Sequence, residues 1–142
     1  MARLTFGALL SALLLSGVQV AAQTTACSPP TWTLDDVKIN FNTPSLANFT
    51  LSNDATGTSD VISCNLQFAT FCELRGTASE KDLYLHLQVK NEDVWVNVTS
   101  SYTCDGKSGR VGGIGEAVAQ CALDKYDCAP ESIVVKGAWS DW

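Results

Sequence analysis

Residues 83–102 read LYLHLQVKNEDVWVNVTSSY and carry the strongest structural signal in the chain. In two runs, aliphatic residues alternate with polar or aromatic ones, which is the two-residue period of a β-strand that buries one face. The polar residues 90–93 separate the two runs and have the length of a hairpin link. The aliphatic sides are predicted to face a core, and the polar sides to face solvent. The polar sides carry Tyr84, His86 and Trp95.

The first 22 residues have the layout of a secretory signal peptide. Arg3 supplies a positive charge, residues 4–15 form an apolar run, and small residues end the segment at Ala22. A membrane anchor is the alternative, but the run is short for a bilayer span and serines interrupt it. Cleavage after Ala22 would leave residues 23–142, which we expect to be one secreted domain with no membrane segment.

The charge balance argues against nucleic acid as a partner. The chain has 15 acidic and 9 basic residues, for a net charge of −6, and loss of Arg3 leaves −7. An acidic surface repels the phosphate backbone of DNA or RNA.

Six cysteines follow the predicted signal peptide: Cys27, Cys64, Cys72, Cys104, Cys121 and Cys128. An even number of cysteines in a small secreted chain predicts three disulfides, and Cys64 and Cys72 are close enough in sequence for a local one. A zinc site is not expected, because the chain has no C-x-x-C pair and a single His. No metal or other cofactor is assigned.

Two triplets match the acceptor sequence for N-linked glycosylation. They are Asn48-Phe49-Thr50 and Asn97-Val98-Thr99. Both asparagines fall at positions that the strand alternation places on an outward face. Glycans are therefore expected at Asn48 and Asn97 in a eukaryotic host.

Further alternating runs predict an all-β fold. The alternation around Trp32 changes phase before Ile39, which predicts a bulge at Asp35-Asp36. Residues 42–45 are predicted to form a turn and 52–60 an exposed loop. Further strands are expected at 47–51, 62–68, 71–74 and 133–135, with Phe68 on the buried face. Seven or eight short strands predict a single antiparallel β-barrel or sandwich, stapled by disulfides.

The glycine-rich residues 104–115 do not form a nucleotide-binding motif. A phosphate loop would need Gly at the position of Ser101, and a dinucleotide fingerprint would need Gly at the position of Val118. A flexible loop or a glycine-rich bulge is predicted instead. Residues 116–123 fit either a strand or a short helix, and 124–131 are predicted to be a turn region.

No catalytic residue is assigned. His86 is the sole His, and no G-x-S-x-G nucleophile motif accompanies it. A ribonuclease of the kind that combines a carboxylate, an Arg and a His on a sheet could use Glu73, Arg75 and His86, and the first two share a strand face. General acid–base catalysis usually needs a separate acid and base, however, and the acidic surface opposes RNA.

The chain ends with two tryptophans in W-x-x-W spacing, Trp139 and Trp142. This spacing occurs in C-mannosylated proteins and resembles the tryptophan-serine box of cytokine-receptor domains. We interpret the pair as aromatics that pack on a terminal strand.

The order of these features is familiar. An early cysteine is followed by a strand with Trp32, and Ile62-Ser63-Cys64 by Phe71-Cys72. The paired strands with Leu83-Tyr84-Leu85 and Val94-Trp95-Val96 come next, and then the glycine-containing segment between Cys104 and Cys121. Together these features resemble the secreted fungal β-barrel family typified by the Alternaria major allergen, which includes allergens and elicitors of plant cell death.

The resemblance implies an antiparallel barrel without catalytic residues and with local disulfides Cys64–Cys72 and Cys104–Cys121, leaving Cys27 with Cys128. On the chain-entropy model, that last bridge would contribute roughly 4–5 kcal/mol. Cys128 and the short spacing between Cys64 and Cys72 depart from the family pattern.

The resemblance also implies a function. We expect a secreted fungal effector or allergen-like protein with a role in virulence, monomeric rather than a disulfide-linked dimer. It would bind a plant host's extracellular protein or a small apolar ligand. A glycan at Asn97 would cover part of the outward face of residues 83–102, so a binding surface is expected instead at the glycine-rich segment or around the terminal tryptophans. The alternatives are a small secreted hydrolase, ribonuclease-like first, and a structural protein of the cell wall.

Overall fold

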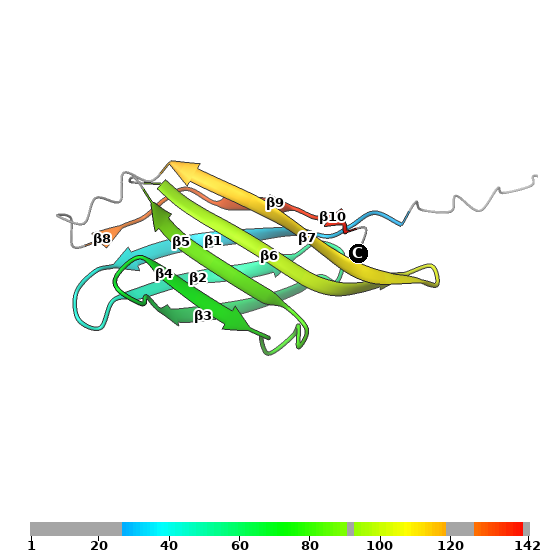
Figure 1. Ribbon diagram of the computed structural model, residues 1–142, viewed down its shortest axis with the longest axis horizontal. Helices are drawn as coiled ribbons and strands as arrows, with labels where there is room; N and C mark the ends of the chain where they lie inside the picture. Colours follow the sequence, from blue (N-terminus) through cyan, green and yellow to red (C-terminus); the bar gives the residue numbers. More distant parts are fainter. Residues whose placement is uncertain (1–26, 91–92, 119–126, 141–142) are drawn as a thin grey trace, which may run out of the picture.

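The computed structural model describes residues 27–90, 93–118 and 127–140, and these form two antiparallel β-sheets packed face to face (Figure 1). The ten strands are β1 (Thr31–Asn40), β2 (Leu46–Asn53), β3 (Thr58–Asn65), β4 (Phe71–Arg75), β5 (Tyr84–Lys90), β6 (Asp93–Cys104), β7 (Lys107–Val118), β8 (Asp127–Cys128), β9 (Ile133–Lys136) and β10 (Ala138–Trp139). The all-β, antiparallel prediction is confirmed. The number of strands exceeds the seven or eight expected because β8 and β10 are two-residue pairings.

The sheets remain separate. The first has the order β3-β2-β1-β8, with β9 paired to another stretch of β1, and the second has the order β10-β7-β6-β5-β4. Figure 1 shows the two layers crossing, with β4 to β7 on one side and β1 to β3 on the other. The sandwich alternative is therefore confirmed, and the closed barrel is wrong, because each sheet ends in its own edge strands.

The core lies between the two layers and is built almost entirely by aliphatic side chains. Alternation along each strand sends one face inward, as predicted for the run 83–102. Both sheets contribute to the buried set, which consists of Trp32, Leu34, Val37, Ile39, Ala47, Phe49, Leu51, Ile62, Cys64, Leu66, Cys72, Leu83, Leu85, Leu87, Val89, Val94, Val96, Val98, Val111, Ile133 and Val135.

The predicted central hairpin is formed by β5 and β6. The ladder runs from Tyr84 opposite Thr99 to Lys90 opposite Asp93. The outer residues of the predicted link 90–93 are thus paired strand residues, and the four-residue link is wrong; residues 91–92 lie outside the described residues.

The predicted bulge in β1 is also confirmed. The register of β1 against β2 shifts between Asp35 and Lys38, and Asp36 has a φ of 52°. The extra residue changes the phase of the strand, so Trp32 and Ile39 both face the core.

Two local predictions between residues 52 and 70 are wrong. The expected loop 52–60 is mostly strand, because β2 continues to Asn53, β3 starts at Thr58, and a tight turn with Gly57 at a φ of 66° joins them. Phe68 is 89% exposed instead of buried. Phe68 has a positive φ in the turn before β4, so the alternation of β3 ends before reaching it.

The glycine-rich segment is the largest correction. In place of a flexible loop, residues 107–118 form β7, a twelve-residue strand paired with β6 along its whole length. A turn at Asp105 and Gly106, both with positive φ, joins the two strands. Of the segment 116–123, the first three residues are strand and the rest lie outside the described residues, whereas the turn region 124–131 contains β8.

Glycine is required at two β7 positions because β9 crosses directly over them. A Cβ atom at Gly113 would lie 2.2 Å from the carbonyl oxygen of Lys136, and one at Gly115 would lie 2.7 Å from that of Val134. The absence of side chains lets the backbones of the two sheets approach closely at this end of the sandwich.

The disulfides follow a different pairing from the one that the family resemblance implies. Cys64 pairs with Cys72 as expected, but Cys27 pairs with Cys104, so the bridges Cys27–Cys128 and Cys104–Cys121 are wrong. Cys27 precedes β1 and Cys104 ends β6, so this bridge ties the start of the first sheet to the second. Cys128 is disulfide-bonded as well, and Cys121 lies outside the described residues.

Disulfides of this kind indicate an oxidising environment such as the extracellular space. Within the described part of the chain, no helix is long and apolar enough to cross a membrane. The predicted signal peptide, residues 1–22, lies outside that part.

Candidate ligand-binding groove

The outward face of the second sheet brings side chains from β5, β6 and β7 into register. Tyr84 on β5 is opposite Thr99 on β6, and Thr99 is opposite Gly112 on β7. In the next row, Asn97 lies between His86 and Ile114. Each row crosses the sheet at a right angle to the strands, so these side chains share one solvent-facing surface.

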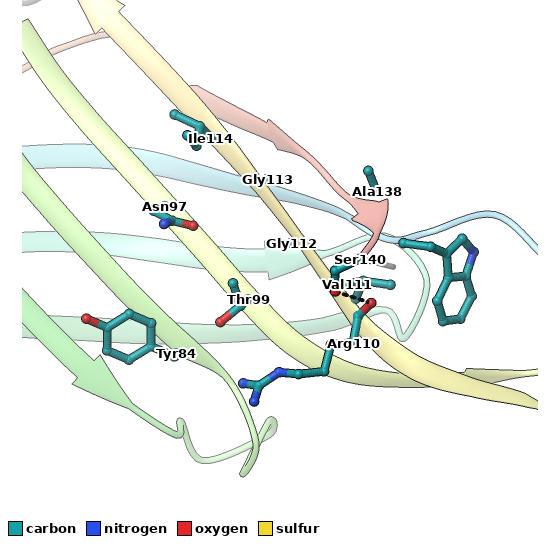
Figure 2. A pocket seen from close by; sticks show the side chains of 11 residues that line it. Tyr84, Asn97, Thr99, Arg110, Val111, Gly112, Gly113, Ile114, Ala138 and Ser140 are labelled. Atoms are coloured by element: carbon teal, nitrogen blue, oxygen red, sulfur yellow. Dashed lines mark hydrogen bonds between the residues drawn. The ribbon is translucent and has the colours of Figure 1, made fainter. Parts of the chain in front are cut away.

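A groove of about 690 Å³ occupies part of this surface (Figure 2). Its volume is within the range of about 300–1,000 Å³ that is usual for small-molecule sites. Figure 2 shows Tyr84, Thr99 and Asn97 on one side and Ile114 on the other, with Arg110 further along. The lining residues are Tyr84, Asn97, Thr99, Arg110, Val111, Gly112, Gly113, Ile114, Ala138, Trp139 and Ser140.

The hollow exists because small residues meet at its centre. Gly112 is paired with Thr99 on one side and with Ala138 of β10 on the other. A Cβ atom at Gly112 would lie 2.8 Å from Cγ2 of Thr99, so even a methyl group would crowd the floor of the groove. Ile114 stands next to this floor with 66% of its surface exposed. The combination gives an apolar depression in the sheet face.

Arg110 supplies the positive charge of the groove. Among the residues that the structure describes, the one contact of a basic side chain with a carboxylate within 4.0 Å is that of His86 with Glu73, so Arg110 has no carboxylate partner there. Its backbone carbonyl accepts hydrogen bonds from the amide and the hydroxyl of Ser140, at 3.0 and 2.9 Å. Ser140 thus holds the chain after β10 against β7.

A second hollow of about 290 Å³ continues the groove along the sheet. It shares Asn97 and Ile114 with the groove and extends to His86, Gln88 and Trp95. Asn97 therefore stands at the boundary between the two hollows.

The residues of the ribonuclease hypothesis meet next to the groove. The hydroxyl of Tyr84 donates a hydrogen bond of 2.9 Å to Oε1 of Glu73, and the same oxygen lies 3.5 Å from Nδ1 of His86. The Arg75 guanidinium lies 5.5 Å from the centre of the Tyr84 ring, and the Phe71 ring stacks on His86. Glu73 and His86 contact each other, so they are not placed on opposite sides of a substrate.

The sequence singled out Glu73, Arg75 and His86 for this hypothesis but gave Tyr84, on the same polar side as His86, no role. Tyr84 contacts Glu73 and Arg75. The missed signal is the pairing of β4 with β5, which sets Arg75 opposite Tyr84. Within the described residues, no group of three or more His, Cys, Asp or Glu side chains could hold a metal ion.

Tyr84 is expected to ionise late. Burial raises its pKa above the ordinary value of 10.0, and the hydrogen bond to the negatively charged Glu73 raises the pKa further. The folded state keeps the proton to a higher pH than the unfolded state. The contribution of the protonated Tyr84 hydroxyl to stability is therefore present below pH 10 and is lost as the pH rises through the raised pKa.

Absorbance titration of tyrosinate is carried out on wild type and on Tyr84→Phe. The difference between the two titration curves gives the pKa of Tyr84. Glu73→Gln should lower the pKa of Tyr84, because the amide keeps an acceptor but removes the charge. A pKa of Tyr84 at or below 10 would contradict this assignment.

Trp139 packs as the sequence predicts for an aromatic on a terminal strand. Its ring lies 5.7 Å from that of Tyr102, and the ammonium of Lys107 lies 4.3 Å from its centre. Trp142 lies outside the described residues. The groove thus runs along the glycine-rich strand and reaches Trp139, the two places where the sequence suggested a binding surface. It is also lined by Tyr84, Asn97 and Thr99, on the face that the sequence analysis expected a glycan to cover.

Both predicted glycosylation residues, Asn48 and Asn97, are exposed on outward strand positions. Asn48 is on β2 in the first sheet and Asn97 on β6 in the second. The two therefore face away from each other across the sandwich.

The chain matches no protein-family model, and neither the curated proteins nor the solved structures contain a match to it.

Proposed function

We propose that this protein is a secreted, non-enzymatic binding protein of the effector or allergen-like kind, and that the groove on the second sheet is its binding site. The observation that supports the proposal is the groove itself, an apolar depression on the outer face of the second sheet, with a guanidinium that no carboxylate of the described residues pairs with. Sites for small ligands combine an apolar lining with a few placed polar groups in this way.

The lining suggests a ligand with an apolar body and a negatively charged group. Ile114 and the backbone of Gly112 offer apolar contact, and the ring of Tyr84 borders them. Arg110 complements an anion, which would otherwise be repelled by a chain of net charge −6. A host extracellular protein could use the same face by inserting a side chain of this character.

The further features of the proposal come from the sequence. The signal peptide supports secretion, the two acceptor triplets support a glycoprotein, and the order of cysteines and strands supports a relationship to the fungal family. The intramolecular bridges Cys27–Cys104 and Cys64–Cys72 support a monomer, because they leave these four cysteines no thiol for a partner chain.

Anilinonaphthalene sulfonate is a suitable probe for the groove, since it combines aromatic rings with a sulfonate. In glycan-free protein with its disulfides formed, we expect saturable binding that enhances the dye's fluorescence. Ile114→Ser should raise the dissociation constant about fivefold or more through lost apolar contact, and Arg110→Gln about tenfold through lost charge.

The matched control is Val61→Ser. Val61 is 86% exposed on β3, in the other sheet, so its loss should leave dye binding unchanged. Near-ultraviolet circular dichroism must be the same for all variants, because loosely packed states also bind this dye. Equal loss of binding in Val61→Ser and Ile114→Ser, or no binding by folded wild type, would contradict the proposal.

The proximity of Glu73 and His86, with Oε1 3.5 Å from Nδ1, supports a second candidate function, a ribonuclease-like hydrolase. For the two groups to act as base and acid, a substrate must displace their direct contact. Incubation with single-stranded RNA, beside His86→Ala, decides between the candidates. RNA cleavage that requires His86 would favour the hydrolase, and intact RNA would favour the binding protein.

A further inference from the structure

Asn97 is part of the groove wall, and this placement gives its glycosylation a specific consequence. The side chain lines both the groove and the hollow beside it. Thr99, which completes the acceptor triplet, also lines the groove. Residues two apart on a strand share a face, so the period of β6 puts both ends of the triplet in the site.

A glycan attached to Asn97 would start between the two hollows. Figure 2 shows the amide of Asn97 between Tyr84 of β5 and Ile114 of β7. The first sugar has hydrogen-bonding and apolar surfaces within reach on both sides, including the hydroxyl of Thr99 and the exposed Trp95 ring. The sugar and a ligand would therefore compete for the same space.

We propose that an N-linked glycan on Asn97 occupies the groove and excludes ligand, so that only protein without a glycan at Asn97 binds. The inference rests on the proposed function and adds its regulation. The ligand class is unchanged, an apolar molecule with an anionic group, and the occupant of the closed site is the chain's own glycan.

Asn48 supplies the internal comparison. It lies on β2 opposite Ser63 of β3 and Lys38 of β1, and it lines a separate hollow with Asn40 and Ala129 on the first sheet. A glycan there projects from the opposite face of the sandwich. Its loss leaves the groove as it is.

The test uses protein secreted from one eukaryotic host in three forms: wild type, Asn97→Gln and Asn48→Gln. Mass spectrometry of glycopeptides measures occupancy, and fluorescence titration with anilinonaphthalene sulfonate measures binding.

The expected result is a dissociation constant at least about tenfold lower for Asn97→Gln than for wild type, which is a difference of about 1.4 kcal/mol or more. Asn48→Gln should bind as weakly as wild type. Equal binding by Asn97→Gln and a wild type shown to carry the glycan would overturn the inference and leave the binding groove intact. An unmodified Asn97 in the secreted wild type would overturn it as well.

If Asn97→Gln fails to bind and the glycan-free protein fails too, the groove is not a binding site, and the inference falls with the proposed function. A Gln side chain is longer than Asn by one methylene group, so Asn97→Ser, which removes the acceptor amide and adds neither length nor charge, shows whether that group blocks the groove. Binding by Asn97→Ser alone would still support the inference.

Discussion

Gly113→Ala is expected to destabilise the domain by about 3 kcal/mol or more, far beyond the usual cost of a methyl group. The new Cβ would lie 2.2 Å from the carbonyl oxygen of Lys136 and 2.9 Å from its carbonyl carbon. Both atoms are backbone of β9, which is paired with β1, so neither can move without displacing the first sheet. Urea unfolding followed by intrinsic fluorescence measures the loss.

Gly109→Ala is the matched control on the same strand. Its Cβ would meet the Trp139 ring at 3.3 Å and no backbone atom within 4 Å. A side chain can shift, so the change in the free energy of unfolding should stay within about 1 kcal/mol. Equal midpoints for wild type and Gly113→Ala would show that β9 does not cross β7 as described.

Trp32→Ala is expected to cost about 3–5 kcal/mol, the usual range for removing a fully buried aromatic side chain. Trp32 is 0% exposed, and β1 holds it between Asn53 of β2 and Val135 of β9. Its indole nitrogen donates to Oε2 of Glu80 at 3.4 Å. The substitution therefore opens a cavity at the centre of the first sheet and removes one partner of a carboxylate.

Trp95→Ala serves as its control, since Trp95 is 39% exposed on the outer face of the second sheet. Its cost should be about 1 kcal/mol or less. Trp32→Phe keeps a ring but loses the indole N–H, so its loss of unfolding free energy should fall between those of Trp32→Ala and Trp95→Ala. A loss under 1 kcal/mol for Trp32→Ala would mean that this side chain is not in the core.

Alternation in the sequence predicted those parts of the fold in which side chains mark the buried face. Residues 83–89 and 94–98 show this best, because every second residue in each run is aliphatic and buried. The bulge in β1 was also visible, since a change of phase is a change of face. Phe68 was misplaced because a turn interrupts the alternation while the sequence still continues it.

Strand β7 was missed because glycine has no side chain with which to mark a face. Four of its twelve residues are glycines, at positions 109, 112, 113 and 115, and composition alone indicates a loop. Their reasons are tertiary: Gly113 and Gly115 accommodate β9, and Gly112 accommodates Thr99. The sequence of β7 alone does not show that β9 crosses over this strand.

The groove and the long-range disulfide depended on the same missing information. Arg110 and Ile114 could not be assigned to a groove from the sequence, because their position depends on the pairing of β7 with β6. Cys27 and Cys104 are 77 residues apart, and only the packing of the β6 end against the start of β1 brings their Cα atoms to 5.7 Å. Cys64 and Cys72, eight residues apart, needed only a local turn.

The outer face of the second sheet thus carries two kinds of chemistry within a few residues of each other. The groove is lined by Arg110 and Ile114, whereas His86 and Glu73 form a contact beside it. The binding hypothesis depends on the first pair and the hydrolase hypothesis on the second. Substitutions that separate them decide how the protein acts.

Leaf infiltration of purified, glycan-free protein tests whether a host response depends on the groove. Wild type is compared with the double variant Arg110→Gln/Ile114→Ser and with His86→Ala, each at matched concentration and with matched circular dichroism. The account predicts a host response to wild type and His86→Ala, and none to the double variant. A response that survives in the double variant, or that is lost in His86→Ala, would contradict the proposal that the protein acts by binding through the groove.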